Sequence, residues 1–302
     1  MTFLHTSIAL GIVATISVGL TGCVLNNTTT DEAISVASSA TECTLSATEA
    51  PAGTIQFEVV NSGDVTTEFY ILANDGMRVV GEVENIGPGL SRNLLIQASA
   101  GTYYTVCKPG GAGAGIGNAV FTVTESGAEV ALSADTQAQV DTAAANYASY
   151  VRNEIDLLTT ETEAFAASYV AGDLDLARSL YAPTRMHWER VETVAESFGD
   201  LDPKLDLREA DLEEGQEWTG WHAIEKDLWP QDADAGFQTY DQAKRELLAE
   251  LLVTDTLSLQ SNVQDLTFDL TQLTNGAIGL LDEVATGKVT GEEEIWSHTD
   301  LW

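Results

Sequence analysis

Residues 142–169 read TAAANYASYVRNEIDLLTTETEAFAASY, and this stretch separates two different patterns in the chain. Apolar residues recur in it at helical spacing, and it contains neither proline nor glycine. Such a pattern predicts a long amphipathic helix. The pattern remains helical after this stretch, whereas the residues before it alternate as strands do. The sequence therefore predicts a multidomain β + α chain.

The part of the chain before this helix contains short apolar segments separated by turn residues. The run Thr54–Asn61 alternates apolar and polar side chains and ends at Ser62-Gly63-Asp64. Short alternating segments with turn signals at this spacing predict a β-sandwich. Further strands are expected at 68–72, 78–83, 92–96, 101–107 and 119–124. We expect residues 41–126 to form this domain.

The helical domain is expected to occupy residues 133–302. Its further helical stretches are expected at 173–198, 237–252, 253–274 and 277–284, with a loop-rich segment at 199–235. Pro183 should break the stretch at 173–198 or mark its beginning, because proline lacks the backbone N–H that a helix interior uses. Long amphipathic helices joined by short connections indicate a bundle.

The first forty residues indicate export. Residues 3–20 are apolar, and Leu20-Thr21-Gly22-Cys23 follows, which resembles the site where a bacterial lipoprotein is cut and lipidated. The apolar stretch is also about long enough for a transmembrane helix, and no lysine or arginine precedes it. We expect a signal peptide at 1–22, lipidation of Cys23 and a flexible tether at 23–40. The protein would then lie in the periplasm or at the cell surface, as part of the cell envelope.

The chain is strongly acidic. It has 47 Asp and Glu against 13 Lys and Arg, and its formal net charge is −34. Such a field repels nucleic acid and attracts cations, so nucleic-acid binding is not expected. Two interpretations of the acidity remain open, namely a surface adapted to salty surroundings and a surface that concentrates metal ions.

Two groups of side chains have spacings that favour metal binding. Glu189, Glu192 and Glu196 would share one face of a helix, where a cation would relieve their repulsion. His222 and Glu225 would place an imidazole and a carboxylate on one face of the next helix, as in the metal sites of helical bundles. Solvated helix faces show the same spacings, so spacing alone leaves both interpretations open.

Longer runs around these residues resemble a known family. Gly220-x-His222-x-x-Glu225 is similar to the GxHxxE motif of imelysin-like proteins, and ESFGDLDPK at 196–204 and WTGWHAIEKDLW at 218–229 are similar to EfeO and EfeM proteins. The resemblance covers residues 43–301. It implies an amino-terminal cupredoxin-like β-sandwich followed by an imelysin-like helical bundle. EfeO proteins continue beyond this segment, so the helical domain is expected to be incomplete here.

The resemblance implies an iron-uptake protein and not an enzyme. Such a protein would bind ferrous or ferric iron in the bundle and deliver it to an EfeU-type permease, with an EfeB-type haem peroxidase as a further partner. The implied ligands are Glu189, Glu192, Asp206, His222 and Glu225. Carboxylates with one imidazole suit iron, and they also accept zinc as a surrogate.

The resemblance also implies a second metal site, in the β domain. Its ligands would be Cys43, Glu68 and Cys107, and its metal would be copper or iron. Thr67 stands where a cupredoxin presents a histidine ligand, so a blue-copper site is not supported. The alternative is a Cys43–Cys107 disulfide, because exported proteins usually bond their remaining cysteines.

Two other functions are open to such a chain, namely a metallopeptidase and a polysaccharide-binding protein. Imelysin-like domains have been classed with peptidases, but zinc hydrolysis needs three protein ligands and an open water position. The His-Glu-x-x-His pattern is absent, and no second histidine follows His222 on its helix. A polysaccharide-binding function has a precedent in a relative that binds alginate, but the negative charge opposes binding of an acidic sugar.

Overall fold

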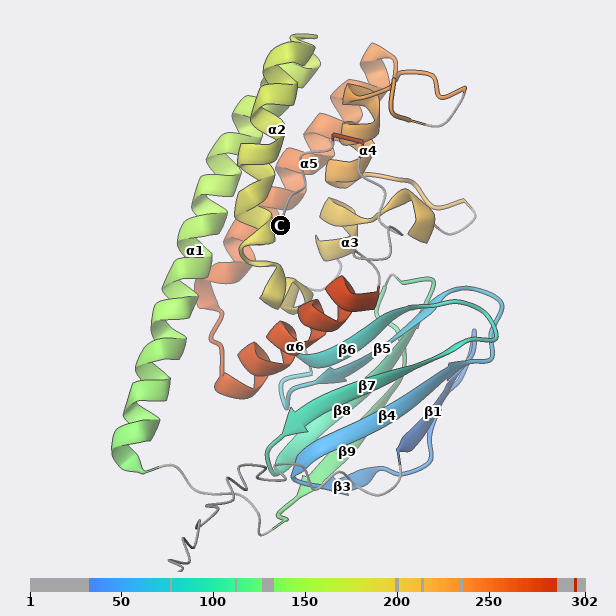
Figure 1. Ribbon diagram of the computed structural model, residues 1–302, viewed down its shortest axis with the longest axis vertical. Helices are drawn as coiled ribbons and strands as arrows, with labels where there is room; N and C mark the ends of the chain where they lie inside the picture. Colours follow the sequence, from blue (N-terminus) through green and yellow to red (C-terminus); the bar gives the residue numbers. More distant parts are fainter. Residues whose placement is uncertain are drawn as a thin grey trace, which may run out of the picture.

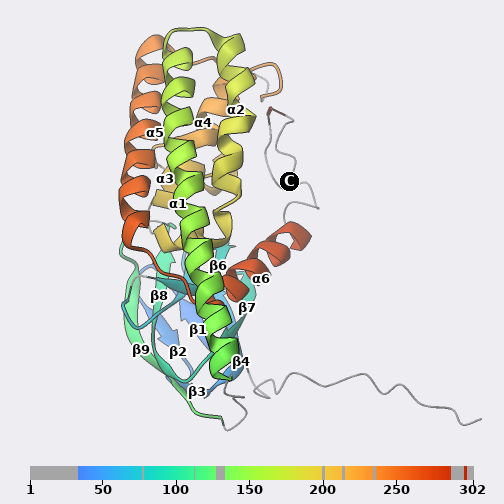
Figure 2. The same cartoon turned by 90° about the vertical axis from the view of Figure 1, so that its left-hand side faces the viewer.

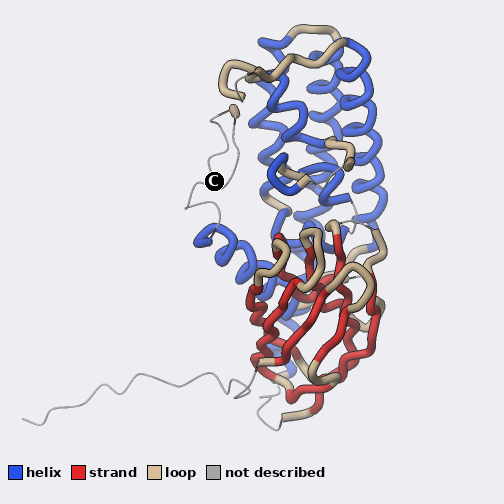
Figure 3. The backbone as a smooth tube through the Cα atoms, turned by 90° about the vertical axis from the view of Figure 1, so that its right-hand side faces the viewer, coloured by secondary structure: helices blue, strands red, loops and turns tan. Residues whose placement is uncertain are grey.

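The structure is a computed structural model that describes residues 33–76, 78–111, 113–126, 133–198, 201–212, 215–233, 236–286 and 296–297. The strands gather at one end of the molecule and the helices at the other (Figures 1 and 3). The expected signal peptide and the lipidated Cys23 lie outside the described residues. Within those residues, no helix combines the length and the apolar character that crossing a membrane requires.

The β domain is a sandwich of two sheets. One sheet has the strand order β2-β1-β4-β7, and the other has the order β3-β9-β8-β5-β6. The strands are β1 (Ile34–Ser38), β2 (Cys43–Leu45), β3 (Glu49–Pro51), β4 (Gly53–Asn61), β5 (Thr67–Leu72), β6 (Val79–Ile86), β7 (Ser91–Ala98), β8 (Gly101–Pro109) and β9 (Ile116–Thr124). Each of the six strands expected from the sequence overlaps one of these.

Strand β4 shows why the two sheets pack. Ile55, Phe57 and Val59 alternate along it and are fully buried. The ring of Phe57 lies 5.4 Å from Phe69 of β5 and 5.5 Å from Phe121 of β9, so aromatic side chains from three strands fill the space between the sheets. Burial of each such side chain contributes roughly 1.5–3 kcal/mol.

Strand β1 occupies part of the segment that was expected to be a flexible tether. Ile34 and Val36 are buried, and β1 pairs in parallel with β4, with Ile34 opposite Phe57. The serine and alanine residues between and after these apolar positions are typical of linkers, and a tether was expected for that reason. The β domain therefore begins before residue 40, and the expectation of a flexible tether is wrong for residues 34–38.

A disulfide joins Cys43 of β2 to Cys107 of β8 and so links the two sheets. Cys107 is fully buried and pairs with Phe69 across β5 and β8. Because neighbouring residues of a strand point to opposite faces, Glu68 points away from the two sulfurs. This corrects the expected second metal site. Its two thiols are bonded to each other, and its carboxylate lies on the other face of the sheet.

The helical domain packs around buried aromatic residues. Its helices are α1 (Ala134–Val170), α2 (Leu174–Glu189), α3 (Leu201–Asp206), α4 (Gly220–Leu228), α5 (Gln242–Asn262) and α6 (Leu270–Thr286). Short 3-10 turns lie at η1 (Glu192–Phe198), η2 (Glu209–Asp211) and η3 (Val263–Asp265). The long helices α1, α2 and α5 run side by side (Figure 2), and the rings of Phe165, Tyr181 and Trp221 pack between elements of this bundle.

Several helix boundaries differ from those expected, and α6 runs without a break through residues 275 and 276. Helix α2 continues through Pro183 and ends at Glu189, so it does not extend to residue 198. The segment 199–235 contains α3 and α4, and α5 runs without a break through the junction expected at 252 and 253.

Helix α6 lies over the side of the sandwich where β6 and β7 meet (Figure 1). Both are edge strands of their sheets. The side chain of Asn275 accepts a hydrogen bond from the backbone N–H of Gln97 and donates one to its carbonyl, each at 3.0 Å. At Gln97, Asn275 therefore satisfies the backbone edge of β7 as a neighbouring strand would.

Helix α6 also contacts η1 of the helical domain. Gly276 lies so close to Thr193 that an added Cβ would stand 2.1 Å from the Thr193 carbonyl oxygen. The Nε2 of Gln272 donates a hydrogen bond to Ser197. One helix therefore joins the two domains, because it contacts the sandwich and the bundle at once.

Helices α1 and α2 are held together by an ion-pair network. Glu154 Oε2 lies 2.7 Å from His187 Nδ1 and 3.1 Å from Arg190 Nη1. Burial alone would raise the pKa of Glu154, but the hydrogen bonds from His187 and Arg190 outweigh it and hold the pKa below its ordinary value of 4.5.

Replacement of Gly276 by alanine is expected to weaken the contact between the domains. The added Cβ must displace the backbone of Thr193, so we expect the free energy of unfolding in urea to fall by about 1–3 kcal/mol. Gly279→Ala is the matched control on the same helix, since nothing lies within 4 Å of its added Cβ. The control should keep or slightly raise stability. Equal stability of the two variants would contradict the close contact.

The Glu154 network predicts a pH-dependent contribution to stability. A carboxyl whose pKa is lower in the folded state stabilises the fold above its unfolded pKa, and this contribution is lost as pH falls through the folded value. Glu154→Gln should therefore cost about 1–3 kcal/mol near neutral pH. The difference from the unmodified protein should shrink below about pH 4.5 in thermal melts. Glu163→Gln, an exposed position on α1, is the control. A difference that stays constant with pH would rule out this role for Glu154.

Candidate metal centre

The position of α4 depends on Gly220, its first residue. Gly220 has a φ of +85°, and a Cβ on it would stand 2.2 Å from the carbonyl oxygen of Leu205. Any other residue would therefore push α4 away from α3. The hydroxyl of Thr219 adds a hydrogen bond to the carbonyl of Lys204 at 3.0 Å. This contact explains the first residue of the GxHxxE motif, because it sets the start of α4 against the end of α3.

The other end of α4 is fixed by Asp227, which is fully buried. Its carboxylate accepts hydrogen bonds from the hydroxyl of Tyr169 at 2.7 Å, the guanidinium of Arg245 at 2.8 Å and the backbone N–H of Tyr240 at 2.6 Å. Burial and the neighbouring Asp227 raise the pKa of Tyr169, so its hydroxyl keeps its proton. Helix α4 is thereby tied to α1 and α5.

This placement brings an imidazole between two carboxylates. His222 and Glu225 are both buried, and His222 Nδ1 lies 3.0 Å from Glu225 Oε2. The other ring nitrogen, Nε2, lies 3.7 Å from Oδ1 of Asp206 at the end of α3. The structure therefore brings together three of the five expected ligands, from two helices that Gly220 sets side by side.

Glu225 is held as an anion. Burial alone would raise its pKa, but the hydrogen bond and charge of His222, the Ser297 N–H and the charge of Arg185 together lower it. The backbone N–H of Ser297 donates to Glu225 Oε1 at 2.8 Å. The adjoining Trp296 packs its ring 5.7 Å from that of Trp218. Nothing in the sequence pattern indicated this contact from so distant a segment.

Arg185 of α2 is a site residue that the sequence analysis missed. Its guanidinium contacts both oxygens of Asp206, at 2.5 and 3.3 Å, and Oε1 of Glu189 at 2.8 Å. Trp188 Nε1 also donates to Asp206 Oδ2, at 3.0 Å. The signal that could have found Arg185 is its i, i+4 spacing to Glu189, because buried carboxylates need a positive partner.

Glu189 and Glu192 do not share a helix face as the sequence analysis expected. Helix α2 ends at Glu189, and Glu192 begins η1, so the helical spacing that relates them is interrupted. Glu189 is paired with Arg185. Glu192 instead lines a cavity of about 660 Å³ that also reaches Asp206 and His222.

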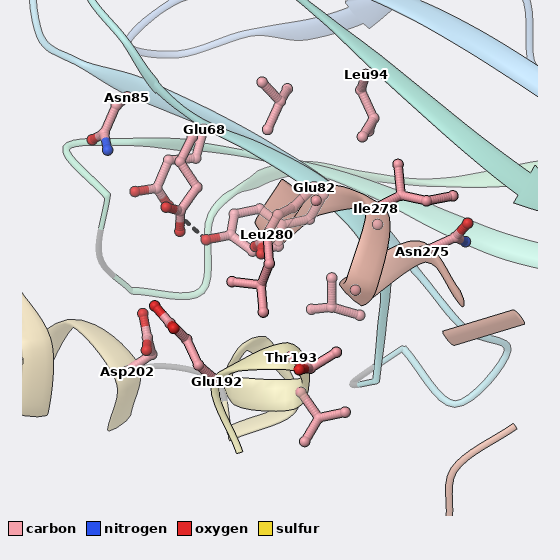
Figure 4. A pocket seen from close by; sticks show the side chains of 18 of the residues that line it. Glu68, Glu82, Asn85, Leu94, Glu192, Thr193, Asp202, Asn275, Ile278 and Leu280 are labelled. Carbon is pink, nitrogen blue, oxygen red and sulfur yellow. Dashed lines mark hydrogen bonds between the residues drawn. The ribbon is translucent and has the colours of Figure 1, made fainter. Parts of the chain in front are cut away.

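This cavity lies between the two domains and is lined by acidic residues of both. Glu68 and Glu82 come from the β domain, whereas Glu192 and Asp202 come from the helical domain. Figure 4 shows the carboxylates of Glu192 and Asp202 directed into the same part of the cavity, with Glu68 on the opposite wall. The hydroxyl of Tyr70 donates to Glu68 Oε2 at 2.7 Å. Arg92 and Arg208 also line the cavity, but the acidic side chains outnumber them, and a surplus of carboxylates favours cations.

The described parts of the chain contain no set of three His, Cys, Asp or Glu side chains that could hold a metal ion between them as they stand. The donor types at Asp206, His222 and Glu225 nevertheless fit iron, because carboxylate oxygen and imidazole nitrogen are ligands that iron accepts. Two contacts separate these donors from a closed site. The guanidinium of Arg185 occupies both oxygens of Asp206, and Glu225 faces Nδ1 of His222 whereas Asp206 faces Nε2.

Comparison with known proteins agrees with this architecture. The family model described as Imelysin matches residues 143–302, and the one described as Cupredoxin-like domain matches residues 11–114. Iron uptake system component EfeO of Yersinia pestis is 39% identical over 269 residues, which cover 86% of this chain and 66% of that protein. The protein of the same name from Escherichia coli (strain K12) is 38% identical over 258 residues, which cover 83% and 64%. The chain thus spans slightly less than two thirds of the length of these relatives.

Among solved structures, reduced auracyanin from Roseiflexus castenholzii matches with 19% identity and a TM-score of 0.21, over 24% of this chain and 81% of that one. The sequence matches confirm the expected resemblance and the order of the two domains. This chain belongs to the imelysin family, carries a cupredoxin-like β domain ahead of its imelysin domain, and is a relative of the EfeO iron uptake components.

Proposed function

We propose that this chain is the exported, lipid-anchored, iron-binding component of an iron-uptake system. It captures ferrous or ferric iron at Asp206, His222 and Glu225 and delivers it to a membrane permease of the EfeU type, with an EfeB-type haem peroxidase as a further partner. The observation that carries the proposal is the buried imidazole of His222 between two carboxylates of different helices. The printed names of the relatives, which are iron uptake components, support it.

The charge of the site favours a cation. Glu225 is anionic because its surroundings lower its pKa, and Asp206 lies close to the same imidazole. In this proposal the side chains of Glu189 and Glu192 move toward the bound metal and complete the ligand set. Glu189 is the last residue of α2 and Glu192 is the first residue of η1, and both elements border the site. Zinc serves as a surrogate in the same donor set.

The acidic cavity supports a path for the metal. Carboxylates of the two domains line it, and it extends to Asp206 and His222. A cation that enters between the domains is attracted by these charges before it reaches the imidazole. The net charge of −34 extends this attraction over the whole protein.

We propose binding and transfer in place of peptidase activity. Within the described residues, the other histidine is His187, and it belongs to the separate network with Glu154 and Arg190. The centre at His222 thus has one imidazole and carboxylates, whereas catalytic zinc sites combine two or three imidazoles, or one imidazole with two thiolates, with an open water position. No observation on the described residues favours hydrolysis over capture.

Titration with Fe²⁺ under anaerobic conditions in a calorimeter tests the proposed site. His222→Ala should weaken iron binding by at least about tenfold, because the buried imidazole is the nitrogen donor of the centre. His187→Ala removes the other described imidazole without touching α4, and it should leave the affinity unchanged. Circular dichroism checks that both variants are folded. If His222→Ala binds iron as tightly as the unmodified protein, the proposed centre is wrong.

A further inference from the structure

Arg185 holds a position that a cation would hold. Its side chain is 6% exposed, and its guanidinium lies between the carboxylates of Asp206 and Glu189. Its charge also contributes to the lowered pKa of Glu225, after the larger contributions of His222 and the Ser297 N–H. A planar guanidinium can contact both oxygens of one carboxylate while it reaches a second, and Arg185 does so here.

The empty centre needs such a charge. Asp206 and Glu225 would otherwise repel one another where water screens charge poorly, and the more exposed Glu189 adds a third negative charge nearby. An arginine does not lose its proton in proteins, so this neutralisation cannot be switched off by deprotonation. If a metal ion is to take the oxygens of Asp206, the guanidinium has to move.

We propose that Arg185 is a built-in counter-ion, which occupies the cation position while the centre is free of metal and is displaced when metal binds. This inference rests on the proposed function, because it assigns a role to Arg185 at the same centre. Displacement frees both oxygens of Asp206, one of which already lies 3.7 Å from His222 Nε2. The guanidinium can leave on the side of Glu189, whose side chain is 33% exposed.

Such an exchange serves a protein that must release its cargo. The bound state is weakened by the displaced charge, and the empty state is stabilised by its return, so the two states lie closer in free energy. A monovalent cation gains too little from the carboxylates to replace a guanidinium with two oxygen contacts, so the exchange also selects for multivalent ions.

A purely structural role for Arg185 makes the opposite prediction. If the guanidinium served only to orient Asp206 and Glu189, its removal would disorder the ligands and weaken metal binding. If it competes with the metal, its removal strengthens metal binding while the metal-free protein becomes less stable. The two roles therefore predict changes of opposite sign in affinity.

The test compares Arg185→Met with the unmodified protein by anaerobic calorimetry with Fe²⁺ and by thermal melts with and without the ion. Methionine keeps an unbranched chain and removes the charge. We expect Arg185→Met to bind Fe²⁺ at least about tenfold more tightly than the unmodified protein does. The melting temperature of the metal-free protein should fall by about 4 °C or more, and the rise on addition of Fe²⁺ should be larger than in the unmodified protein.

Arg152→Met is the matched control. It removes the same charge from α1, where the guanidinium of Arg152 donates to Ser149 one turn earlier. Its iron affinity should equal that of the unmodified protein, which separates local competition from the change in net charge. Arg185→Lys keeps the charge but cannot reach two carboxylates in the same way, so its affinity should lie between those of the other two forms. If Arg185→Met does not fold, the iron affinity of Arg185→Lys tests the counter-ion role by itself.

Unchanged or weaker iron binding by the Arg185 variants, in a protein whose binding depends on His222, would overturn the counter-ion role and leave the proposed function intact. Iron binding that is independent of His222, or binding by none of the proteins, would overturn both. Tighter binding by the Arg185 variants that is lost again on addition of His222→Ala would support both.

Discussion

The contact between Gly220 and the carbonyl of Leu205 determines the geometry of the centre. Because this contact leaves no room for a Cβ, α4 can begin directly against the end of α3. His222 and Glu225 then lie one turn into α4, beside Asp206. The buried carboxylate of Asp227 fixes the far end of the same helix through Tyr169 and Arg245. The imidazole is thus positioned by backbone contact at one end of its helix and by a charge network at the other.

The sequence predicted the order of the domains and the residues of α4 because each depends on a local pattern. The strand at β4 alternates, α1 lacks proline and glycine, and His222 and Glu225 are related by one helical turn. Strand β1 was not predicted because Ile34 and Val36 are too few large apolar residues to give a strand pattern. Its structure depends on parallel pairing with β4, which lies later in the sequence. Its order is a property of the tertiary fold.

The remainder of the centre could not be predicted for the same physical reason. Whether Glu189 and Glu192 share a face depends on where α2 ends, and Arg190 at that end is paired with Glu154 of α1, which lies far away in the sequence. The i, i+4 spacing of Arg185 to Glu189 indicates an ion pair on α2, but the contact of Arg185 with Asp206 depends on the placement of α3 beside α2. The prediction of a second metal site was wrong because it rested on the types of residue alone. The face of the sheet that a side chain occupies depends on strand register, and this register places Glu68 and Cys107 on opposite faces.

The pairing of Asn275 with Gln97 has a consequence for solubility. The free edge of a sheet can add a strand from another molecule, and this is a common route to aggregation. Asn275 offers to Gln97 the donor and acceptor that such a strand would offer, and the body of α6 covers the adjoining edge of β6. The helix that joins the domains therefore also occupies part of the open edge of the sandwich, and loss of interdomain packing would leave that part free to pair with another chain.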